Sequence, residues 1–168
     1  MSSDRIMAEE PIEKKITRIL IHRKMTVTAA ESCTGGLVAG TLVNADGISE
    51  VFKESYVTYS NEAKHKLLGV KKETLEKYGA VSRQTAAEMA EGAVRAAGAD
   101  ASVVTTGVAG PGGGTEEKPV GLVYIGCYVK GCTIVKRCFY GGDRQGVRYS
   151  AVKEALDILY CQLLADEH

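Results

Sequence analysis

The segment AESCTGG, residues 30–36, groups side chains that could form the centre of a catalytic site. It places the hydroxyl of Ser32 beside the thiol of Cys33, after the carboxylate of Glu31 and before two glycines. A hydroxyl or a thiol becomes a nucleophile once a neighbouring base removes its proton. Glycines that lead into a helix can also bring backbone N–H groups close to an anion. The segment could therefore hold a nucleophile, bind an anion, or merely connect two elements.

Histidine is the most frequent base for such nucleophiles, but the three histidines of this sequence are poorly placed for that role. His168 ends the chain, His22 ends a predicted helix, and His65 lies on a polar helix face. A reactive thiolate at Cys33 would also need a nearby cation, and no histidine lies close to it in the sequence. This leaves a hydroxyl paired with a lysine whose pKa is lowered by burial or by a neighbouring cation.

Lys64 is the best candidate for such a base. It lies one turn into a predicted helix that begins at the end of a strand, so its amine can point into the same cleft as Ser32. Tyr59 ends that strand and could relay a proton or donate a hydrogen bond. A surface lysine and a half-buried strand tyrosine fit the same spacing, so both interpretations stay open at this point.

Two further segments could bind an anion. GVAGPGGGT contains five glycines between Gly107 and Gly114, and such backbone can form a concave nest of N–H groups. It is not a Walker A loop, because Lys and Ser/Thr do not follow in that register. Arg144 lies in the first turn of the last predicted helix, where the helix dipole favours anions over cations. Its position indicates an anionic ligand such as a phosphate, with a flexible loop and a solvated arginine as the alternative.

The elements that must position these residues alternate between helices and strands. Helices are predicted at about 9–24, 35–44, 62–69, 71–79, 83–98 and 143–165, and strands at about 26–30, 53–60, 100–107, 121–129 and 132–140. Helices and strands that alternate along the chain, followed by a late β-hairpin, predict an α/β fold, a three-layer α/β/α sandwich with a mixed sheet. In such sheets the ligand loops gather at the carboxyl ends of strands, which would bring segments 31–36, 59–64 and 106–115 together.

Composition narrows the class of protein. At 168 residues we expect a flexible tail at 1–8 and a single domain at 9–168. Lys plus Arg and Asp plus Glu balance at 21 each, which argues against a nucleic-acid binder but allows a local basic pocket. The sequence has no long apolar run and no signal peptide, and its five cysteines form no CxxC pair. We therefore expect a cytoplasmic protein with reduced thiols and no metal site.

Several blocks in a fixed order resemble the CinA C-terminal domain family. They are TAAESCTGG, YVTYSNEAKHKLLGV, GAVS, TGVAGPGGGTEEKPVGLVYIG and GDR, and the resemblance runs from about Ile12 to Leu164. The best-known activity of this family is hydrolysis of the carboxamide of nicotinamide mononucleotide (NMN), which gives nicotinic acid mononucleotide and ammonia. Full-length CinA proteins carry a further N-terminal domain, so the resemblance implies a stand-alone amidase form without cofactor or metal.

The resemblance also implies roles for individual residues. Ser32 would be the nucleophile and Lys64 the base, with Tyr59 assisting. The expected substrate-binding residues are Thr34, Gly35, Gly36, Thr106, Gly107, Gly110, Gly112, Gly113 and Arg144. The expected partner is a small pyridine nucleotide rather than a nucleic acid or a membrane, and apolar edge strands favour a homodimer. The alternatives are a thiol amidase that uses Cys33 and a non-catalytic nucleotide-binding module related to DNA uptake.

Overall fold

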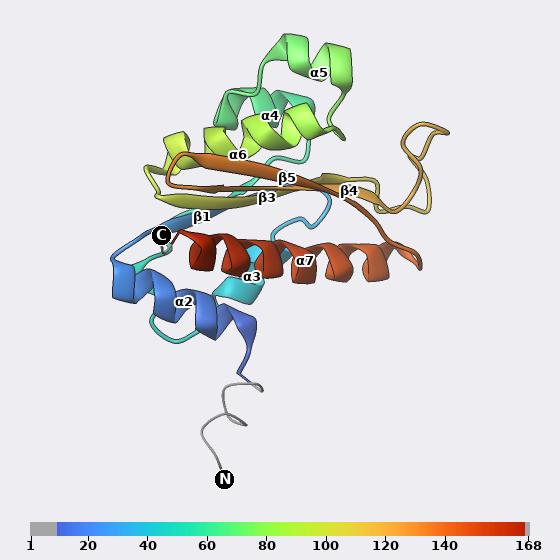
Figure 1. The fold of residues 1–168 in the computed structure, drawn as a ribbon. Coiled ribbons are helices and arrows are strands. Elements are labelled where there is room, and N and C mark those ends of the chain that lie inside the picture. Colours follow the sequence, from blue (N-terminus) through green and yellow to red (C-terminus); the bar gives the residue numbers. More distant parts are fainter. Residues whose placement is uncertain (1–9, 167–168) are drawn as a thin grey trace.

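The protein folds around one five-stranded sheet with helices on both faces, as the computed structural model of residues 10–166 shows (Figure 1). The strand order is β2-β1-β3-β4-β5. The strands are Val27–Glu31 (β1), Tyr56–Val57 (β2), Ala101–Gly107 (β3), Leu122–Val129 (β4) and Cys132–Phe139 (β5). Strand β1 is parallel to β2 and β3, whereas β4 is antiparallel to both of its neighbours. The predicted three-layer α/β/α sandwich with a mixed sheet is confirmed, and the tail predicted at 1–8 lies outside the described residues.

Within residues 10–166, three α-helices cover each face of the sheet (Figure 1). One layer contains Ile12–Arg23 (α2), Leu37–Leu42 (α3) and Arg144–Ala165 (α7), and the other contains Asn61–Leu68 (α4), Lys72–Tyr78 (α5) and Arg83–Ala97 (α6). A short 3-10 helix spans Ile48–Glu50. Within residues 10–166 no helix combines the length and the apolar character that crossing a membrane requires.

Both faces of the central strands are buried, and these strands consist mainly of small, apolar and threonine residues. Along β3, Val103 packs in the core beneath α2 and α7, and Val104 packs in the second core beneath α6. Successive strand residues point to opposite faces, so a strand between two helical layers buries the side chains of both faces, and its polar side chains need hydrogen-bond partners, as Ser102 finds in the Ala90 carbonyl. Leu156 and Leu159 of α7 fill the first core, and Met89 of α6 lies in the second.

Close backbone approach sets where α4 lies. A Cβ added to Gly92 of α6 would lie 1.9 Å from the carbonyl oxygen of Leu68, the last residue of α4. Only glycine therefore permits this contact between the two helices. Ser60 caps the other end of α4 by accepting a hydrogen bond from the Ala63 N–H at 3.0 Å. The Ser60 cap and the contact between Gly92 and Leu68 together fix the rotation of α4, the helix that carries Lys64.

Two elements are shorter than the sequence predicts. The strand expected at 53–60 is reduced to Tyr56–Val57, because the Thr58 carbonyl faces the Lys64 amine and Ser60 begins the helix cap. The helix expected from residue 35 begins at Leu37 instead. Gly35 and Gly36 have φ of +59° and +104°, outside the helical region, so they form the turn that precedes α3.

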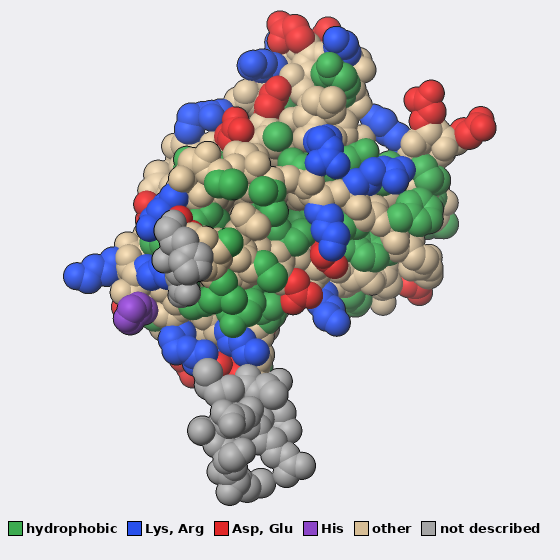
Figure 2. Space-filling view, in the orientation of Figure 1, with side chains coloured by type: hydrophobic (Ala, Val, Ile, Leu, Met, Phe, Trp, Pro, Cys, Tyr) green, Lys and Arg blue, Asp and Glu red, His purple; other side chains and the backbone are tan. Residues whose placement is uncertain are grey.

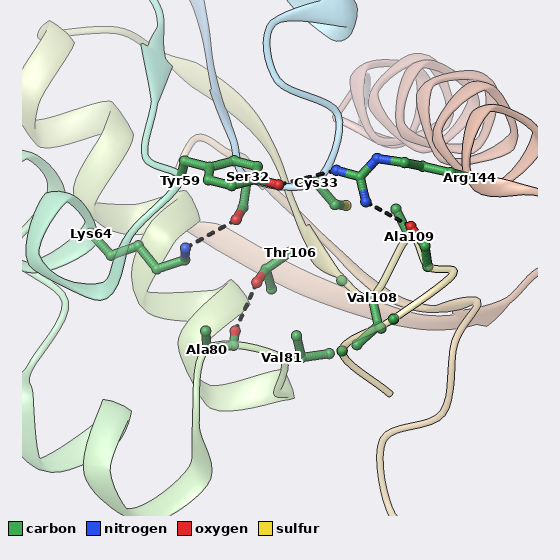
Figure 3. Close-up of a pocket in the computed structure, with 14 residues that line it drawn as sticks. Ser32, Cys33, Tyr59, Lys64, Ala80, Val81, Thr106, Val108, Ala109 and Arg144 are labelled. Atoms are coloured by element: carbon green, nitrogen blue, oxygen red, sulfur yellow. Dashed lines mark hydrogen bonds between the residues drawn. The ribbon is translucent and has the colours of Figure 1, made fainter. Parts of the chain in front are cut away.

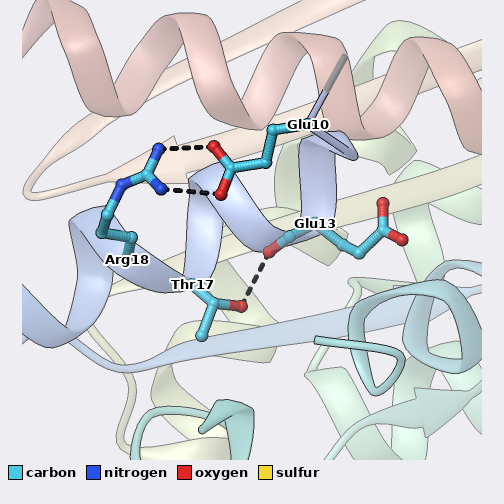
Figure 4. A network of polar contacts seen from close by, with 4 residues as sticks. All are labelled: Glu10, Glu13, Thr17 and Arg18. Carbon is cyan, nitrogen blue, oxygen red and sulfur yellow. Dashed lines mark hydrogen bonds and ion pairs between the residues drawn. The ribbon is translucent and has the colours of Figure 1, made fainter. Parts of the chain in front are cut away.

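The surface carries charges of both signs. Figure 2, in which the sheet is seen from one edge with a helical layer above it and another below it, shows basic and acidic side chains interspersed, in keeping with the balanced composition. At the start of α2, both guanidinium Nη atoms of Arg18 donate to the carboxylate of Glu10 at 2.7 Å (Figure 4). Thr17 in the same helix donates to the Glu13 carbonyl at 2.7 Å. The Arg18–Glu10 pair is exposed, so its contribution to stability is small.

Candidate active site

A pocket of about 300 Å³ lies where β1 and β3 end (Figure 3). This is the edge of the sheet at which ligand loops of α/β folds gather. The predicted site residues that line it are Ser32, Tyr59, Lys64, Thr106, Gly107, Gly110, Gly112, Gly113 and Arg144. Segments far apart in the sequence thus meet at one opening.

Ser32 and Lys64 form a direct pair in this pocket (Figure 3). Ser32 directly follows β1, and its N–H donates to the Thr105 carbonyl of β3 at 3.0 Å. The Lys64 Nζ donates to the Ser32 Oγ at 3.1 Å and to the Thr58 carbonyl at 2.8 Å. Lys64 is only 1% exposed and forms no ion pair with any residue in 10–166. Burial therefore lowers the pKa of Lys64 from its ordinary 10.5 to about 8.

Cys33 lines the same pocket, but its environment does not activate it. Its side chain is buried, and burial raises the pKa of the Cys33 thiol to about 11. A thiol with this pKa stays protonated near neutral pH, whereas nucleophilic attack needs the thiolate. The raised pKa of the Cys33 thiol and the lowered pKa of the Lys64 amine beside Ser32 favour Ser32 over Cys33 as the nucleophile.

Tyr59 contacts Arg144 rather than the Ser32–Lys64 pair. The Arg144 Nη2 donates to the Tyr59 hydroxyl at 3.1 Å, and its Nη1 donates to the Gly110 carbonyl at 2.7 Å. In the described part of the chain the tyrosine has no hydrogen bond to Ser32 or Lys64, and it is 64% exposed. Its contacts here place the arginine at the mouth of the pocket and show no proton relay.

Glu31 stabilises the turn after β1 and does not contact Lys64. Its buried carboxylate accepts hydrogen bonds from the Thr34 hydroxyl at 2.6 Å, the Val38 N–H at 2.8 Å and the Ala39 N–H at 3.1 Å. These bonds satisfy backbone donors at the start of α3, which otherwise lack intrahelical partners. The sequence alone leaves open whether Glu31 orients a lysine or satisfies backbone donors, because both roles fit a carboxylate beside a glycine turn.

Three of the predicted substrate-binding residues do not line the pocket: Thr34, Gly35 and Gly36. Thr34 is fully buried, and its hydroxyl contacts both Glu31 and Thr105, at 2.6 and 2.7 Å. The two glycines form the left-handed turn described above. In this structure all three residues shape the turn that presents Ser32.

The glycine-rich loop forms the opposite side of the pocket. A Cβ at Gly107 would lie 2.7 Å from the Leu122 carbonyl oxygen, so the backbones of β3 and β4 meet closely there. The N–H groups of Gly110, Gly112 and Gly113 form no hydrogen bond to any residue within 10–166. Backbone N–H groups without partners in a concave loop can bind an anion.

Sequence reasoning missed the apolar wall of the pocket, which consists of Ala80, Val81, Val108 and Ala109. The Thr106 hydroxyl donates to the Ala80 carbonyl at 2.8 Å and joins this wall to β3 (Figure 3). The only sequence signal was the GAVS block, because small apolar side chains carry no chemistry of their own.

Within residues 10–166 no three His, Cys, Asp or Glu side chains gather in a way that could hold a metal ion.

The arrangement suits nucleophilic attack on a small, polar substrate. A hydroxyl lies beside an amine that is partly neutral at neutral pH, and the glycine-rich loop and an arginine line the same opening. None of the described residues that line the pocket is acidic. This charge distribution favours an anionic ligand.

Comparison with known proteins gives the family. The sequence profile of the CinA C-terminal domain family matches residues 9–163. A protein of Clostridium beijerinckii named as competence-damage inducible is 55% identical over 158 residues, which cover 93% of this chain and 38% of that protein. A Clostridioides difficile protein of the same name is 54% identical over 155 residues, covering 92% of this chain and 37% of that protein.

Solved structures agree with this assignment. A CinA superfamily protein from Klebsiella pneumoniae has a TM-score of 0.87 at 35% identity and covers 92% of this chain and 96% of that chain. A competence/damage inducible protein from Agrobacterium tumefaciens has a TM-score of 0.83 at 42% identity and covers 90% of this chain and 96% of that chain. The family profile, the relatives and the shared fold together show that this chain belongs to the CinA C-terminal domain family.

Proposed function

We propose that this chain is an amidohydrolase that converts NMN to nicotinic acid mononucleotide and ammonia. The single observation that carries the proposal is the buried Lys64 amine, 3.1 Å from the Ser32 Oγ and without an acidic partner among the described residues. A lysine kept partly neutral beside a hydroxyl can act as its general base. Membership of the CinA family makes a carboxamide the first substrate to test.

The reaction would proceed through an acyl-enzyme. Neutral Lys64 takes the proton of Ser32, whose Oγ attacks the carboxamide carbon of NMN. Backbone N–H donors stabilise the resulting oxyanion, and each such donor contributes about 3–4 kcal/mol to catalysis. The protonated Lys64 then passes its proton to the leaving nitrogen, which departs as ammonia. Water, deprotonated by Lys64, hydrolyses the Ser32 ester and releases the carboxylate product.

The rest of the pocket fits the remaining parts of NMN. The wall of small apolar side chains at Ala80, Val81, Val108 and Ala109 can contact the flat pyridine ring. Arg144, at the mouth, can donate a charge-assisted hydrogen bond to the phosphate in exchange for its present contacts with Tyr59 and Gly110. The pocket volume of about 300 Å³ is at the lower end for small-molecule sites, so one mononucleotide is the expected occupant.

Ammonia release from NMN by the purified protein tests the proposal. We expect steady turnover by the wild type, loss of several orders of magnitude in Ser32→Ala, and most of the activity retained in the matched Cys33→Ala control. Lys64→Arg should also be inactive, because arginine cannot give up its proton. Activity that survives Ser32→Ala but not Cys33→Ala would transfer the mechanism to the thiol. NMN binding in a calorimeter without ammonia release would indicate a non-catalytic nucleotide-binding module instead.

A further inference from the structure

A second arginine is directed at the backbone that follows Ser32. Arg148 is half-buried and lies one turn after Arg144 on α7. Its Nε donates to the Cys33 carbonyl at 3.0 Å, and its Nη2 donates to the Thr34 carbonyl at 3.1 Å. Arg148 forms no ion pair with any residue in 10–166 and does not line the pocket. Its two hydrogen bonds to successive carbonyls are therefore its main polar contacts.

Those two carbonyls control the turn that presents the nucleophile. The Gly35 N–H donates back to the Ser32 carbonyl at 3.1 Å, so the peptide between Thr34 and Gly35 is held at both ends. The C=O and N–H of a planar trans peptide point in opposite directions, so the bond from Arg148 to the Cys33 carbonyl also sets the direction of the Thr34 N–H.

The turn contains two unused donors. The N–H groups of Cys33 and Thr34 form no hydrogen bond to another residue in the described chain, and of these two residues only Cys33 lines the pocket. A backbone N–H that faces a pocket and has no partner in another residue can donate to a bound ligand. An N–H donor next to the nucleophile is well placed to stabilise the oxyanion that forms when Ser32 attacks a carbonyl group.

The glycine at position 35 fits this arrangement. A Cβ added to Gly35 would lie 3.4 Å from the Arg148 Nη2, and the φ of +59° disfavours any other residue there. The backbone of the turn can thus lie directly against the guanidinium. A lysine could not replace it, because a single ammonium lacks the rigid fork that reaches two neighbouring carbonyls at once.

We infer that Arg148 is a positioning residue for the proposed amidase: it holds the backbone of Cys33 and Thr34 so that Ser32 stays at Lys64 and the Cys33 N–H, on the pocket side of the turn, stays available to the oxyanion. The inference rests on the proposed function. Arg148 acts on the transition state through the backbone and has no contact with the substrate. Its loss should therefore lower kcat and leave KM almost unchanged.

The test compares Arg148→Ala and Arg148→Lys with Lys153→Ala, which removes an exposed cation from the same helix. We expect both Arg148 variants to lose about tenfold to a hundredfold in kcat on NMN, with KM within about threefold of the wild type. Guanidinium ion added to Arg148→Ala should restore activity several-fold, and Lys153→Ala should behave as the wild type. An unchanged kcat in Arg148→Ala would overturn the inference, as would a raised KM at constant kcat, which would indicate substrate contact.

A second readout separates this inference from the proposed function. Acylation of Ser32 by an activated ester such as p-nitrophenyl acetate is followed by mass spectrometry of the intact protein, with Ser32→Ala as the unlabelled control. If the wild type acylates but does not hydrolyse NMN, the proposed function fails, and slower acylation in Arg148→Ala still supports the role of Arg148. Equal acylation rates would overturn it, and absence of both reactions in the wild type would overturn both proposals. If Arg148→Ala does not fold, a wild-type kcat in a folded Arg148→Lys overturns the inference.

Discussion

Replacing Lys64 by methionine should remove the proposed base and at the same time stabilise the fold near neutral pH. Lys64 is 1% exposed, and its amine has the Ser32 Oγ and the Thr58 carbonyl as partners but no carboxylate. Holding a cation there is unfavourable, since neither partner carries a charge that compensates for lost hydration. Methionine is similarly long and unbranched and carries no charge, so it can occupy the same space.

The lowered pKa gives the size of the effect. A fall in the pKa of Lys64 from 10.5 to about 8 corresponds to about 3 kcal/mol of unfavourable free energy for the charged, folded form. Methionine removes this cost but leaves the Thr58 carbonyl without its donor, which costs about 1–3 kcal/mol. We therefore expect the free energy of unfolding at pH 7 to rise by about 0–2 kcal/mol in Lys64→Met, the difference between these two effects.

The pH dependence is the sharper test, because the lost hydrogen bond does not titrate. In the unfolded chain Lys64 keeps its proton up to about pH 10.5, whereas in the folded chain it loses that proton near pH 8. Between these values the unfolded state binds more protons, so the stability of the wild type rises with pH. Relative to Lys64→Met, the wild type should gain about 2 kcal/mol between pH 7 and pH 9.5.

Urea unfolding of both proteins at pH 7 and pH 9.5 measures this gain. Lys66→Met is the matched control, because Lys66 is exposed on the same helix and its replacement should shift stability equally at both pH values. A gap between wild type and Lys64→Met that does not change with pH would refute the reasoning. It would mean that Lys64 keeps its ordinary pKa and is unsuited to act as a base near neutral pH.

Three further predictions follow from the site. First, kcat/KM on NMN should rise about tenfold per pH unit below pH 8 and level off above it as Lys64 loses its proton, and a break near pH 10 would contradict this. Second, Arg144→Ala should lower kcat/KM on NMN by about tenfold to a hundredfold but hardly affect the riboside, since one charge-assisted hydrogen bond contributes about 1.5–3 kcal/mol; equal losses would assign Arg144 to the amide or the fold. Third, Glu31→Gln should lower the free energy of unfolding by about 1–3 kcal/mol in urea titrations, because the amide replaces one of the two accepting oxygens with an NH2 donor, and an unchanged midpoint would argue against the anchoring role of Glu31.

The location of the site was predictable because it follows from local signals and one rule of topology. Ser32 directly follows the short buried strand β1, and Ser60 marks a helix start three residues after β2 ends, so both Ser32 and Lys64 lie near strand ends. Parallel strands bring their carboxyl ends to one edge of a sheet, and β1 is parallel to both β2 and β3. The glycine-rich loop after β3 reaches the same edge for the same reason.

Contacts between distant segments were not predictable in this way. The hydrogen bonds from Arg148 to the turn after Ser32 join residues more than a hundred positions apart, and nothing local to α7 distinguishes Arg148 from a solvated arginine. The hydrogen bond between Arg144 and Tyr59 likewise joins residues that are far apart in the sequence. For Thr34 the resemblance to the CinA family implies substrate contact, whereas the structure shows its hydroxyl buried against Glu31, a contact with no local signal in the sequence.

The choice between a surface lysine and a buried base at position 64 shows where sequence reasoning stops. Leu67 and Leu68 are adjacent, so the apolar pattern of α4 allows either residue to define the buried face. Lys64 shares a face with Leu68 at a spacing of one turn, and in the structure both are buried while Leu67 is 42% exposed. The deciding residue is Gly92, far along the chain on α6, because its missing side chain admits the Leu68 backbone. A glycine in the middle of a helix is unfavourable on its own, so its presence there was a sign that another backbone approaches at that point.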